Sequence, residues 1–219
     1  MTAAERKKPI GIFGGTFDPI HYGHLRTALE IEQTLGLARV YFVPCATPPH
    51  RATPMTDGKL RLKLVKAAIR GEKKFIADDR ELARAGPSYT VDTLASFRAE
   101  FPRRSLCLLV GMDAFLGLPT WRRWGELLDL AHLVVAHRPG SRAPTTGALG
   151  KLLDERRAAD PAELRGAAAG RVFVHPVTQL QISSTDLRAA LVAGLDPKFL
   201  MPDSVRKIIL KTECYAENP

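Results

Sequence analysis

Two histidines near the start of the chain, His21 and His24, follow a pair of glycines, Gly14 and Gly15. The glycines come directly after an apolar run and let the backbone approach a ligand closely. A helix is predicted to begin beside the histidines, so its free N–H groups and positive dipole end favour an anion. Each imidazole can donate a hydrogen bond to a phosphate oxygen, and its protonation would add charge where negative charge develops. The spacing predicts a phosphate site, with Gly23 leaving room for a nucleobase or phosphate against the backbone.

Other interpretations of these residues are open. The glycines form neither the G-x-G-x-x-G pattern of dinucleotide-binding folds nor the G-x-x-x-x-G-K-[ST] pattern of a P-loop, which disfavours both of those nucleotide sites. His21 and His24 can also be interpreted as ordinary surface histidines or as a metal-binding pair. Zinc usually takes three or four protein ligands, and the neighbouring sequence supplies no others, so a metal site is not expected here.

A second cluster of hydroxyl and basic side chains lies near the end of the chain. Ser183, Ser184, Thr185 and Arg188 follow the last predicted strand and stand at the start of a predicted helix. Hydroxyl groups, first-turn N–H groups and a guanidinium together favour an anion. Because Ser and Thr are common N-caps, the cluster taken alone is better explained as an ordinary helix start. The interpretation as an anion site is favoured if the first and last strands reach the same crevice, where both clusters could hold one ligand.

Short apolar runs alternate with helical patterns along most of the chain. We expect strands at residues 10–13, 40–43, 75–77, 106–110, 133–136 and 172–174, and helices at 25–35, 57–68, 89–101, 183–192 and 202–210. This alternation predicts an α/β fold with a doubly wound, mainly parallel sheet and helices on both faces. Such sheets bind ligands at the carboxyl ends of their strands. We expect one domain over residues 1–219, with a C-terminal helical part at about 183–213 and an exposed insert with one or two helices at 138–170.

The composition is that of an ordinary globular protein. Of 219 residues, 45% are hydrophobic and 25% are charged. No apolar run approaches about 18 residues, so we expect no membrane span. Three cysteines far apart in the chain, Cys45, Cys107 and Cys214, favour a reducing cytoplasm over a disulfide framework. The net charge of +9 implies an anionic partner. Without an aromatic-rich RNA motif or a recognition helix, that partner is not expected to be nucleic acid.

The two clusters together resemble a known superfamily. G-G-T-F-D-P-I-H-Y-G-H at residues 14–24 and I-S-S-T-D-L-R at 182–188 are similar to the motifs of nucleotidyltransferases of the H-x-G-H and I-S-S-T-x-x-R type. Within that superfamily the chain resembles the bacterial nicotinate-nucleotide adenylyltransferases. Further matching segments are P-P-H-R at 48–51, P-S-Y-T-V-D-T-L at 87–94, V-G-M-D-A-F at 110–115, P-T-W-R-R-W at 119–124 and A-H-R-P-G at 136–140. Residues 141–170 match no motif of the family.

The resemblance implies a reaction and an ATP site. AMP would pass directly from ATP to nicotinate mononucleotide, giving nicotinate adenine dinucleotide (deamido-NAD) and pyrophosphate without a covalent enzyme intermediate. Catalysis is assigned to His21, His24 and Arg188. ATP binding is assigned to these three and to the residues around them: Phe13, Gly14, Gly15, Thr16, Ile182, Ser183, Ser184 and Thr185. Mg²⁺ would accompany ATP, held mostly by phosphate oxygens and water.

The resemblance also implies a site for the acceptor. Trp121 would stack on the pyridine ring, and main-chain N–H groups near Thr90 and Arg122 would receive the nicotinate carboxylate. Asp113 would hold the ribose hydroxyls. Alternative interpretations make Trp121 a core side chain and Asp113 a helix cap.

Two more residues are assigned to the mononucleotide. Arg138 would bind its phosphate, and His50, in a proline-rich loop, would close over the substrate. The alternatives are an ordinary surface charge for Arg138 and a plain exposed histidine for His50.

Other functions are also considered. The acceptor could be nicotinamide mononucleotide or phosphopantetheine, although phosphopantetheine enzymes of this superfamily are shorter and lack the tryptophan segment. A module that binds nucleic acid would account for the positive charge, and a non-catalytic nucleotide sensor would account for the fold. The sequence leaves the oligomeric state and the preference between the two mononucleotides open.

Overall fold

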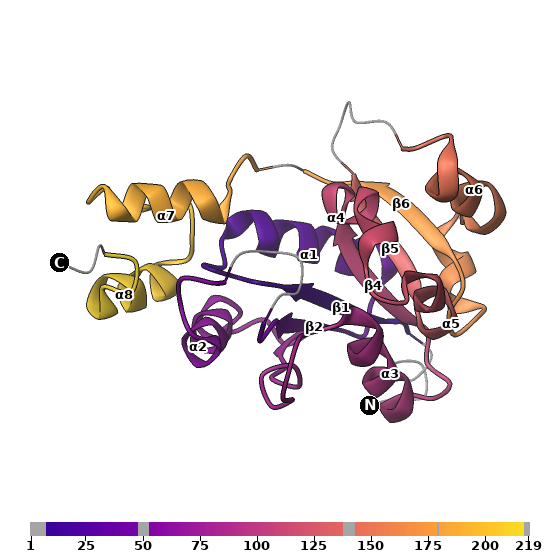
Figure 1. Ribbon diagram of the computed structural model, residues 1–219, viewed down its shortest axis with the longest axis horizontal. Helices are drawn as coiled ribbons and strands as arrows, with labels where there is room; N and C mark the ends of the chain where they lie inside the picture. Colours follow the sequence, from indigo (N-terminus) through magenta and orange to yellow (C-terminus); the bar gives the residue numbers. More distant parts are fainter. Residues whose placement is uncertain (1–7, 48–52, 138–142, 179, 217–219) are drawn as a thin grey trace. The chain divides into compact units, whose positions relative to one another are not determined.

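A computed structural model describes residues 8–47, 53–137, 143–178 and 180–216. Six strands form one sheet in the order β3-β2-β1-β4-β5-β6 (Figure 1). Their bounds are Ile10–Gly15 for β1, Arg39–Pro44 for β2, Phe75–Ala77 for β3, Leu106–Gly111 for β4, His132–His137 for β5 and Val172–Pro176 for β6. Strand β4 runs parallel to β1 and to β5, and β5 runs parallel to β6. The prediction of a doubly wound, mainly parallel sheet is confirmed, and the strand order reverses between β1 and β4.

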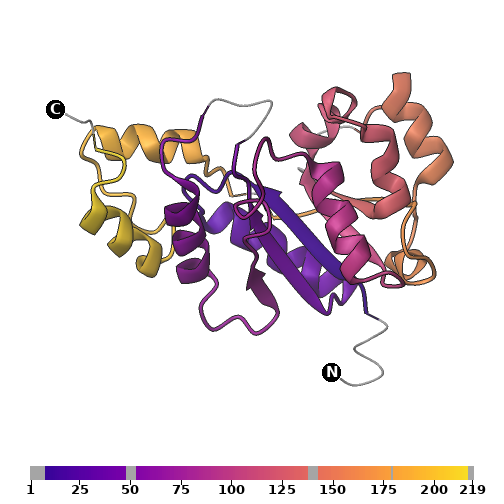
Figure 2. The same ribbon diagram turned by 60° about the horizontal axis from the view of Figure 1, so that its bottom comes forward.

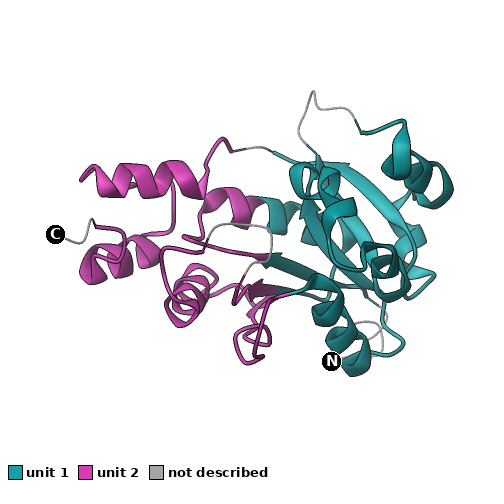
Figure 3. Cartoon of the chain, in the orientation of Figure 1, with its two compact units in different colours: residues 1–14, 27–41, 89–179 teal, residues 15–26, 42–88, 180–219 magenta. Residues whose placement is uncertain are grey.

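The chain divides into two compact units, coloured separately in Figure 3. Unit 1 comprises residues 1–14, 27–41 and 89–179, and unit 2 comprises residues 15–26, 42–88 and 180–219. The helices are α1 (Tyr22–Leu35), α2 (Gly58–Ala68), α3 (Thr90–Glu100), α4 (Met112–Leu116), α5 (Leu127–Leu130), α6 (Gly147–Arg156), α7 (Ser184–Val192) and α8 (Asp203–Thr212). In the described ranges, every helix is too short or too polar to cross a membrane.

In unit 1 the core is built on β4, whose continuous apolar run fits a strand covered on both faces. Leu108 lies opposite Leu133 of β5 in the parallel register, and both side chains are almost fully buried. Helix α4 packs against β4 and β5, and α5 packs against β5 and α3. Phe97 of α3 and Phe115 of α4 are both completely buried. The sequence patterns predicted α3, but not α4 or α5, because those two helices have only five and four residues.

The segment predicted as an exposed insert is in fact packed onto unit 1 where the structure describes it. It contains α6 and a short 3₁₀ helix at Pro161–Arg165, which agrees with the one or two helices expected. Its side chains Leu149, Leu153 and Leu164 are buried. The hydroxyl of Ser105 donates to the Leu164 carbonyl oxygen over 2.7 Å. The prediction of exposure was wrong because frequent Ala, Gly and Arg residues hid three well-spaced core leucines.

Unit 2 contains α2, α7 and α8 (Figure 3). Asp57, predicted to open this helix, is the N-cap of α2, and its carboxylate accepts a 2.8 Å hydrogen bond from the Leu60 N–H. It packs against β3 and α8, and the Ser204 hydroxyl of α8 donates to the Ala67 carbonyl oxygen over 2.9 Å. The two C-terminal helices α7 and α8 lie side by side in both Figure 1 and Figure 2.

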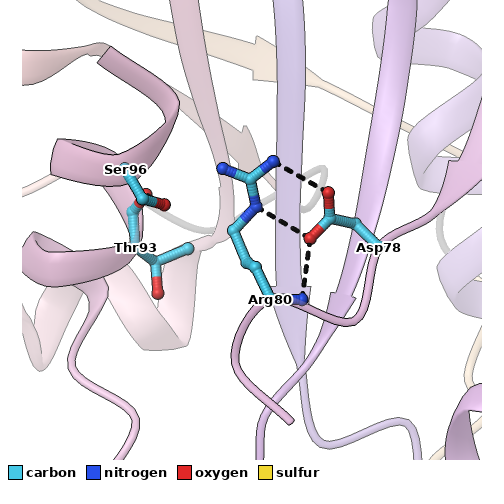
Figure 4. A network of polar contacts seen from close by, with 4 residues as sticks. All are labelled: Asp78, Arg80, Thr93 and Ser96. Atoms are coloured by element: carbon cyan, nitrogen blue, oxygen red, sulfur yellow. Dashed lines mark hydrogen bonds and ion pairs between the residues drawn. The ribbon is translucent and has the colours of Figure 1, made fainter. Parts of the chain in front are cut away.

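The turn that leaves β3 is held by a bidentate ion pair, drawn in Figure 4. The Arg80 guanidinium donates to both carboxylate oxygens of Asp78, at 2.8 and 2.9 Å. The Arg80 main-chain N–H donates to the same carboxylate at 3.0 Å. Both side chains are largely buried, so the pair is less screened by solvent than a surface pair would be. It fixes the start of the loop between β3 and α3.

Candidate active site

The loop after β1 is tightened by an aromatic ring. Phe17 has a left-handed backbone (φ 50°) and is 2% exposed. A Cβ at Gly15 would lie 3.0 Å from the Phe17 ring, so this glycine is needed for the close approach. The rings of Phe17 and His24 form a T-shaped pair, with 5.2 Å between ring centroids and an interplanar angle of 79°. The ring therefore supports the second histidine of the H-x-G-H motif.

The two motif histidines lie against each other at the start of α1. Their ring centroids are 3.8 Å apart, with an interplanar angle of 31°. The His21 main-chain N–H faces Nδ1 of His24 at 3.4 Å. Because Nδ1 of His24 accepts, its neutral ring carries the proton on Nε2. The Nε2–H group is therefore the hydrogen-bond donor of the neutral His24 ring.

The environment of His21 favours its neutral form. The side chain is 5% exposed, and burial lowers its pKa to about 4. Its Nδ1 atom is buried and has no hydrogen-bond partner among the described residues. In the absence of an anion, His21 is therefore neutral at pH 7. A phosphate beside the ring would raise this pKa, because an opposite charge favours the protonated form.

Gly23 was predicted to leave room for a ligand, but in the structure it makes room for the ring of His21. A Cβ at this position would lie 2.9 Å from both Cε1 and Nδ1 of His21. It would also lie 3.6 Å from the main-chain oxygen of Ile182. The space that the sequence analysis assigned to a nucleobase or phosphate is thus occupied by the imidazole of His21. The glycine is required because the first histidine folds back over it.

The hydroxyls of the second motif are engaged with the protein itself. Ser183 is the N-cap of α7, and its side chain accepts a 3.0 Å hydrogen bond from the Asp186 N–H. Ser184 donates its hydroxyl to the Pro19 carbonyl oxygen over 3.0 Å. The N-cap interpretation of Ser183 is therefore confirmed. The groups of this motif suited to an anion are the first-turn N–H groups of α7 and the basic side chain one turn on.

Arg188 links the second motif to the first. Its Nη1 donates to the Asp18 carbonyl oxygen over 2.7 Å. Its Nη2 lies 3.3 Å from the Thr185 hydroxyl. Together with the bond from Ser184 to Pro19, this contact brings residues 18–24 and 182–188 together inside unit 2.

A buried arginine holds the other side of the glycine loop. Arg61 of α2 is 1% exposed, and its guanidinium donates to three main-chain oxygens. These belong to Thr16 at 2.8 Å, Thr56 at 3.2 Å and Ala46 at 3.3 Å. The Thr16 backbone, predicted to lie beside ATP, is thereby fixed to the segments that follow β2 and precede α2.

The acceptor residues that the structure describes belong to unit 1. Thr90 is the first residue of α3, so the unbonded N–H groups of a helix start lie there. Tyr89 directly precedes Thr90, and the Arg122 guanidinium lies over the Tyr89 ring, 4.6 Å from its centroid. A side chain of the Arg122 segment is thus in contact with a side chain next to Thr90.

The exposure of Trp121 and the position of Asp113 test the alternative interpretations of these residues, as a core side chain and as a helix cap. Trp121 and Trp124 are both half-buried, so neither is a closed core side chain. Asp113 is exposed in the first turn of α4, and Gly111 holds the N-cap position. The cap interpretation of Asp113 was therefore wrong. The candidates Arg138 and His50 lie outside the described residues.

The remaining ATP candidates lie at the end of β1. Phe13 and Gly14 belong to unit 1, whereas Gly15 and the later candidates belong to unit 2. Phe13 is buried, Gly14 is exposed, and a Cβ at Gly14 would meet no atom within 4 Å. Protein packing therefore does not require this glycine.

The described residues contain no group of three or more His, Cys, Asp or Glu side chains placed to hold a metal ion. The carboxylate nearest in sequence to the histidines is Asp18, which is 2% exposed. Its oxygens accept hydrogen bonds from the Met55 N–H, the Thr56 hydroxyl and the Tyr215 hydroxyl. This donor set leaves the carboxylate poorly suited to ligate Mg²⁺.

The sequence analysis missed four residues that shape this site: Phe17, Asp18, Arg61 and Tyr215. The sequence analysis gave Asp18 no role beyond its place in the first motif and gave Arg61 none. The partners of Asp18 lie 37 to 197 positions away along the chain, as in the bonds from Met55 and Tyr215, and the Thr16 partner of Arg61 lies 45 positions away. The sequence offers no local signal for such pairs.

Comparison with known proteins gives the family. Residues 12–190 match the cytidylyltransferase-like family. The chain is 46% identical over 209 residues to a "probable nicotinate-nucleotide adenylyltransferase" of Methylococcus capsulatus, covering 95% of this chain and 100% of that one. Identity to a protein of the same name from Aeromonas hydrophila is also 46%, covering 95% and 98% of the two chains. The fold matches a Plasmodium falciparum nicotinic acid mononucleotide adenylyltransferase with a TM-score of 0.71, at 20% identity over 95% and 97% of the chains. The chain therefore belongs to the cytidylyltransferase-like family and, within it, to the nicotinate-nucleotide adenylyltransferases.

Proposed function

We propose that this chain transfers AMP from ATP to nicotinate mononucleotide, forming nicotinate adenine dinucleotide and pyrophosphate in NAD biosynthesis. The observation that carries the proposal is the contact between the two motifs, made by Arg188 and the Asp18 carbonyl oxygen. The names of the bacterial relatives support the substrate. A further support is that the Plasmodium falciparum protein of the same fold was solved in complex with NaAD.

The chemistry needs no protein nucleophile. An oxygen of the mononucleotide 5′-phosphate attacks the α-phosphorus of ATP in line, the bond to the bridging oxygen breaks, and pyrophosphate leaves. Catalysis then rests on alignment and on stabilising charge in the transition state. The Nε2–H of His24 is the donor proposed to meet the ATP phosphates, because its other ring nitrogen accepts from the His21 N–H. Fixing both reactants in line can lower the barrier by about 7–11 kcal/mol.

The leaving pyrophosphate is assigned to the start of α7. Helix N–H groups in the first turn of α7 supply donors, and the helix dipole places partial positive charge there. Arg188 adds a full charge and remains held by the Asp18 carbonyl oxygen. An arginine fixed in this way loses less conformational freedom when it binds phosphate than a mobile one would. Phe13, Gly14, Gly15 and Thr16 are proposed to line the nucleotide.

The acceptor is assigned to unit 1. The N-terminus of α3 at Thr90 and the segment at Arg122 are proposed to hold the nicotinate carboxylate, since a helix start favours an anion. Half-buried Trp121 offers a ring face for the pyridine. Asp113 is proposed to bind the ribose hydroxyls, with Arg138 on the phosphate and His50 over the substrate.

Mg²⁺ is proposed to arrive with ATP, held by phosphate oxygens and water. The hydrogen bonds to the Asp18 carboxylate support this, because they occupy the carboxylate that lies nearest in sequence to the histidines. When bound, the ion would neutralise charge on the phosphates. We also assign the activity to the cytoplasm, supported by the free state of Cys45, Cys107 and Cys214.

The decisive test is product analysis with a panel of acceptors. The purified chain is incubated with ATP, Mg²⁺ and either nicotinate mononucleotide, nicotinamide mononucleotide or phosphopantetheine. We expect nicotinate adenine dinucleotide and pyrophosphate in equal amounts, with the highest kcat/KM for nicotinate mononucleotide. A higher kcat/KM for the amide would overturn the acceptor assignment. A chain that binds ATP but forms no product with any acceptor would behave as a sensor.

A further inference from the structure

The carboxylate of Asp18 is a buried junction of three chain segments. Its Oδ1 accepts from the Thr56 hydroxyl and from the Tyr215 hydroxyl, each over 2.7 Å. Its Oδ2 accepts from the Met55 N–H over 2.8 Å. Asp18 is 2% exposed and Tyr215 is 1% exposed. Hydrogen bonds to a charged, buried group are strong, and losing one donor leaves that group poorly compensated.

The same residue also touches the proposed triphosphate site through its backbone. The Asp18 carbonyl oxygen accepts from Arg188, and the next carbonyl oxygen, that of Pro19, accepts from Ser184. Two positions further on is His21. Tyr215 is thus connected to Arg188 through Asp18. The Tyr215 hydroxyl bonds to the Asp18 carboxylate, and the Asp18 main-chain carbonyl oxygen accepts from the guanidinium that is assigned to pyrophosphate.

We propose that Tyr215, near the end of the chain, is a positioning residue for the triphosphate site, acting through Asp18 on Arg188. The proposal rests on the proposed function and extends it to a residue nearly two hundred positions from the first motif. The phenol holds the Asp18 carboxylate, and the carboxylate holds the turn whose carbonyl oxygens orient Arg188 and the start of α7.

The chemistry of the phenol suits this role. Burial and the hydrogen bond to Asp18 both raise the pKa of Tyr215, so its hydroxyl stays protonated and remains a donor at every working pH. Its ring fills the site whether or not the hydroxyl is present. Tyr215→Phe therefore removes one hydrogen bond and keeps the packing of the ring, so it separates the effect of the hydrogen bond from that of the ring's volume.

The test compares Tyr215→Phe with a matched control, Tyr41→Phe. Tyr41 is also buried, at 7% exposure, but it lies in unit 1 and packs against Phe97. Affinity for ATP is measured by calorimetry, and kcat and KM are measured by pyrophosphate release. For Tyr215→Phe we expect ATP affinity and kcat each to fall about fivefold to twentyfold, with the KM for nicotinate mononucleotide unchanged. Tyr41→Phe should match the wild type in all three quantities.

A double-mutant cycle identifies the route. If Tyr215 acts through the guanidinium, Tyr215→Phe should cost less than about twofold when Arg188 is already Lys. Thr56→Val, which removes the other donor to the same carboxylate oxygen, should reproduce the effect and serves if Tyr215→Phe does not fold. Full additivity with Arg188→Lys, or a loss of thermal stability alone, would overturn the proposal. A wild-type chain that forms no product would overturn the proposed function instead, while the calorimetric comparison still judges the role of Tyr215.

Discussion

Arg188 donates to the main-chain carbonyl oxygen of Asp18 over 2.7 Å, although 170 positions separate the two residues. This bond places the basic residue of the late motif beside the loop that carries the two histidines of the early one. Because both ends lie in the same compact unit, the geometry needs no assumption about how the two units are arranged. The phosphate site can therefore be tested by variants within unit 2 alone.

His24→Ala tests the proposed donor. The Phe17 ring and the His21 N–H fix the His24 ring in the folded chain, so its loss removes a pre-positioned hydrogen bond to the phosphates. We expect kcat to fall by about 10²–10³, while circular dichroism shows an unchanged fold. Steady-state kinetics provide the measurement. Turnover near that of the wild type would remove His24 from the catalytic residues.

Gly23→Ala tests the packing of the motif. The added methyl would lie 2.9 Å from the His21 ring, so the imidazole must rotate away, and we expect a loss of kcat of at least about tenfold with modest destabilisation. Gly166→Ala is a suitable control, because its nearest added contact, to the Glu163 carbonyl oxygen, is an ordinary 3.7 Å. Kinetics of both variants decide the question. Equal activity of the two alanine variants would contradict the role assigned to Gly23.

The pKa of His21 predicts how stability depends on pH. Burial lowers the pKa from 6.5 to about 4, so between these values the unfolded chain binds more protons than the folded chain. The free energy of unfolding therefore rises with pH in this window. The contribution of His21 is fully present above about pH 6.5 and is lost as the pH falls towards about 4.

His132 and His175 also have lowered pKa values, caused chiefly by burial, and act in the same direction. Urea denaturation from pH 4.5 to 7 measures how steeply the free energy of unfolding rises with pH. In His21→Gln we expect that slope, expressed as the difference in bound protons between the unfolded and folded chain, to be smaller by up to about one proton. An unchanged slope would show that His21 is not a buried neutral group in the folded chain.

Trp121→Ala tests the acceptor site. A half-buried ring that stacks on the pyridine contributes to mononucleotide binding and not to ATP binding. We expect the KM for nicotinate mononucleotide to rise about tenfold or more, while the KM for ATP stays within about twofold. Trp124→Ala, which changes the neighbouring half-buried tryptophan, serves as the comparison. Equal rises in both KM values would place the Trp121 ring elsewhere.

The elements that could be predicted are those with local signals. Gly36 ends α1 with a left-handed backbone of φ 60°, and Asp57 caps α2 through its own side chain. The apolar run of β4 needs only its own composition to be recognised as a buried strand. The phosphate motifs belong to the same class, because their residues follow strands and begin helices.

The features that could not be predicted depend on distant partners. Arg61 lies among other basic residues of α2, and only the fold reveals that it donates to three main-chain oxygens. Tyr215 finds Asp18 across almost the whole sequence. The role of Gly23 was misjudged for a related reason, because nothing in the spacing H-x-G-H tells that the His21 ring folds back over the glycine.

In the proposed ATP site, His24 and Arg188 hold the phosphates of the same ATP molecule. The most direct measurement is a crystal structure of the chain with Mg²⁺ and a non-hydrolysable ATP analogue. We predict that His24 Nε2 and the Arg188 guanidinium each lie about 3 Å from an oxygen of one triphosphate. A triphosphate bound by only one of these residues, or bound elsewhere on the chain, would contradict the account.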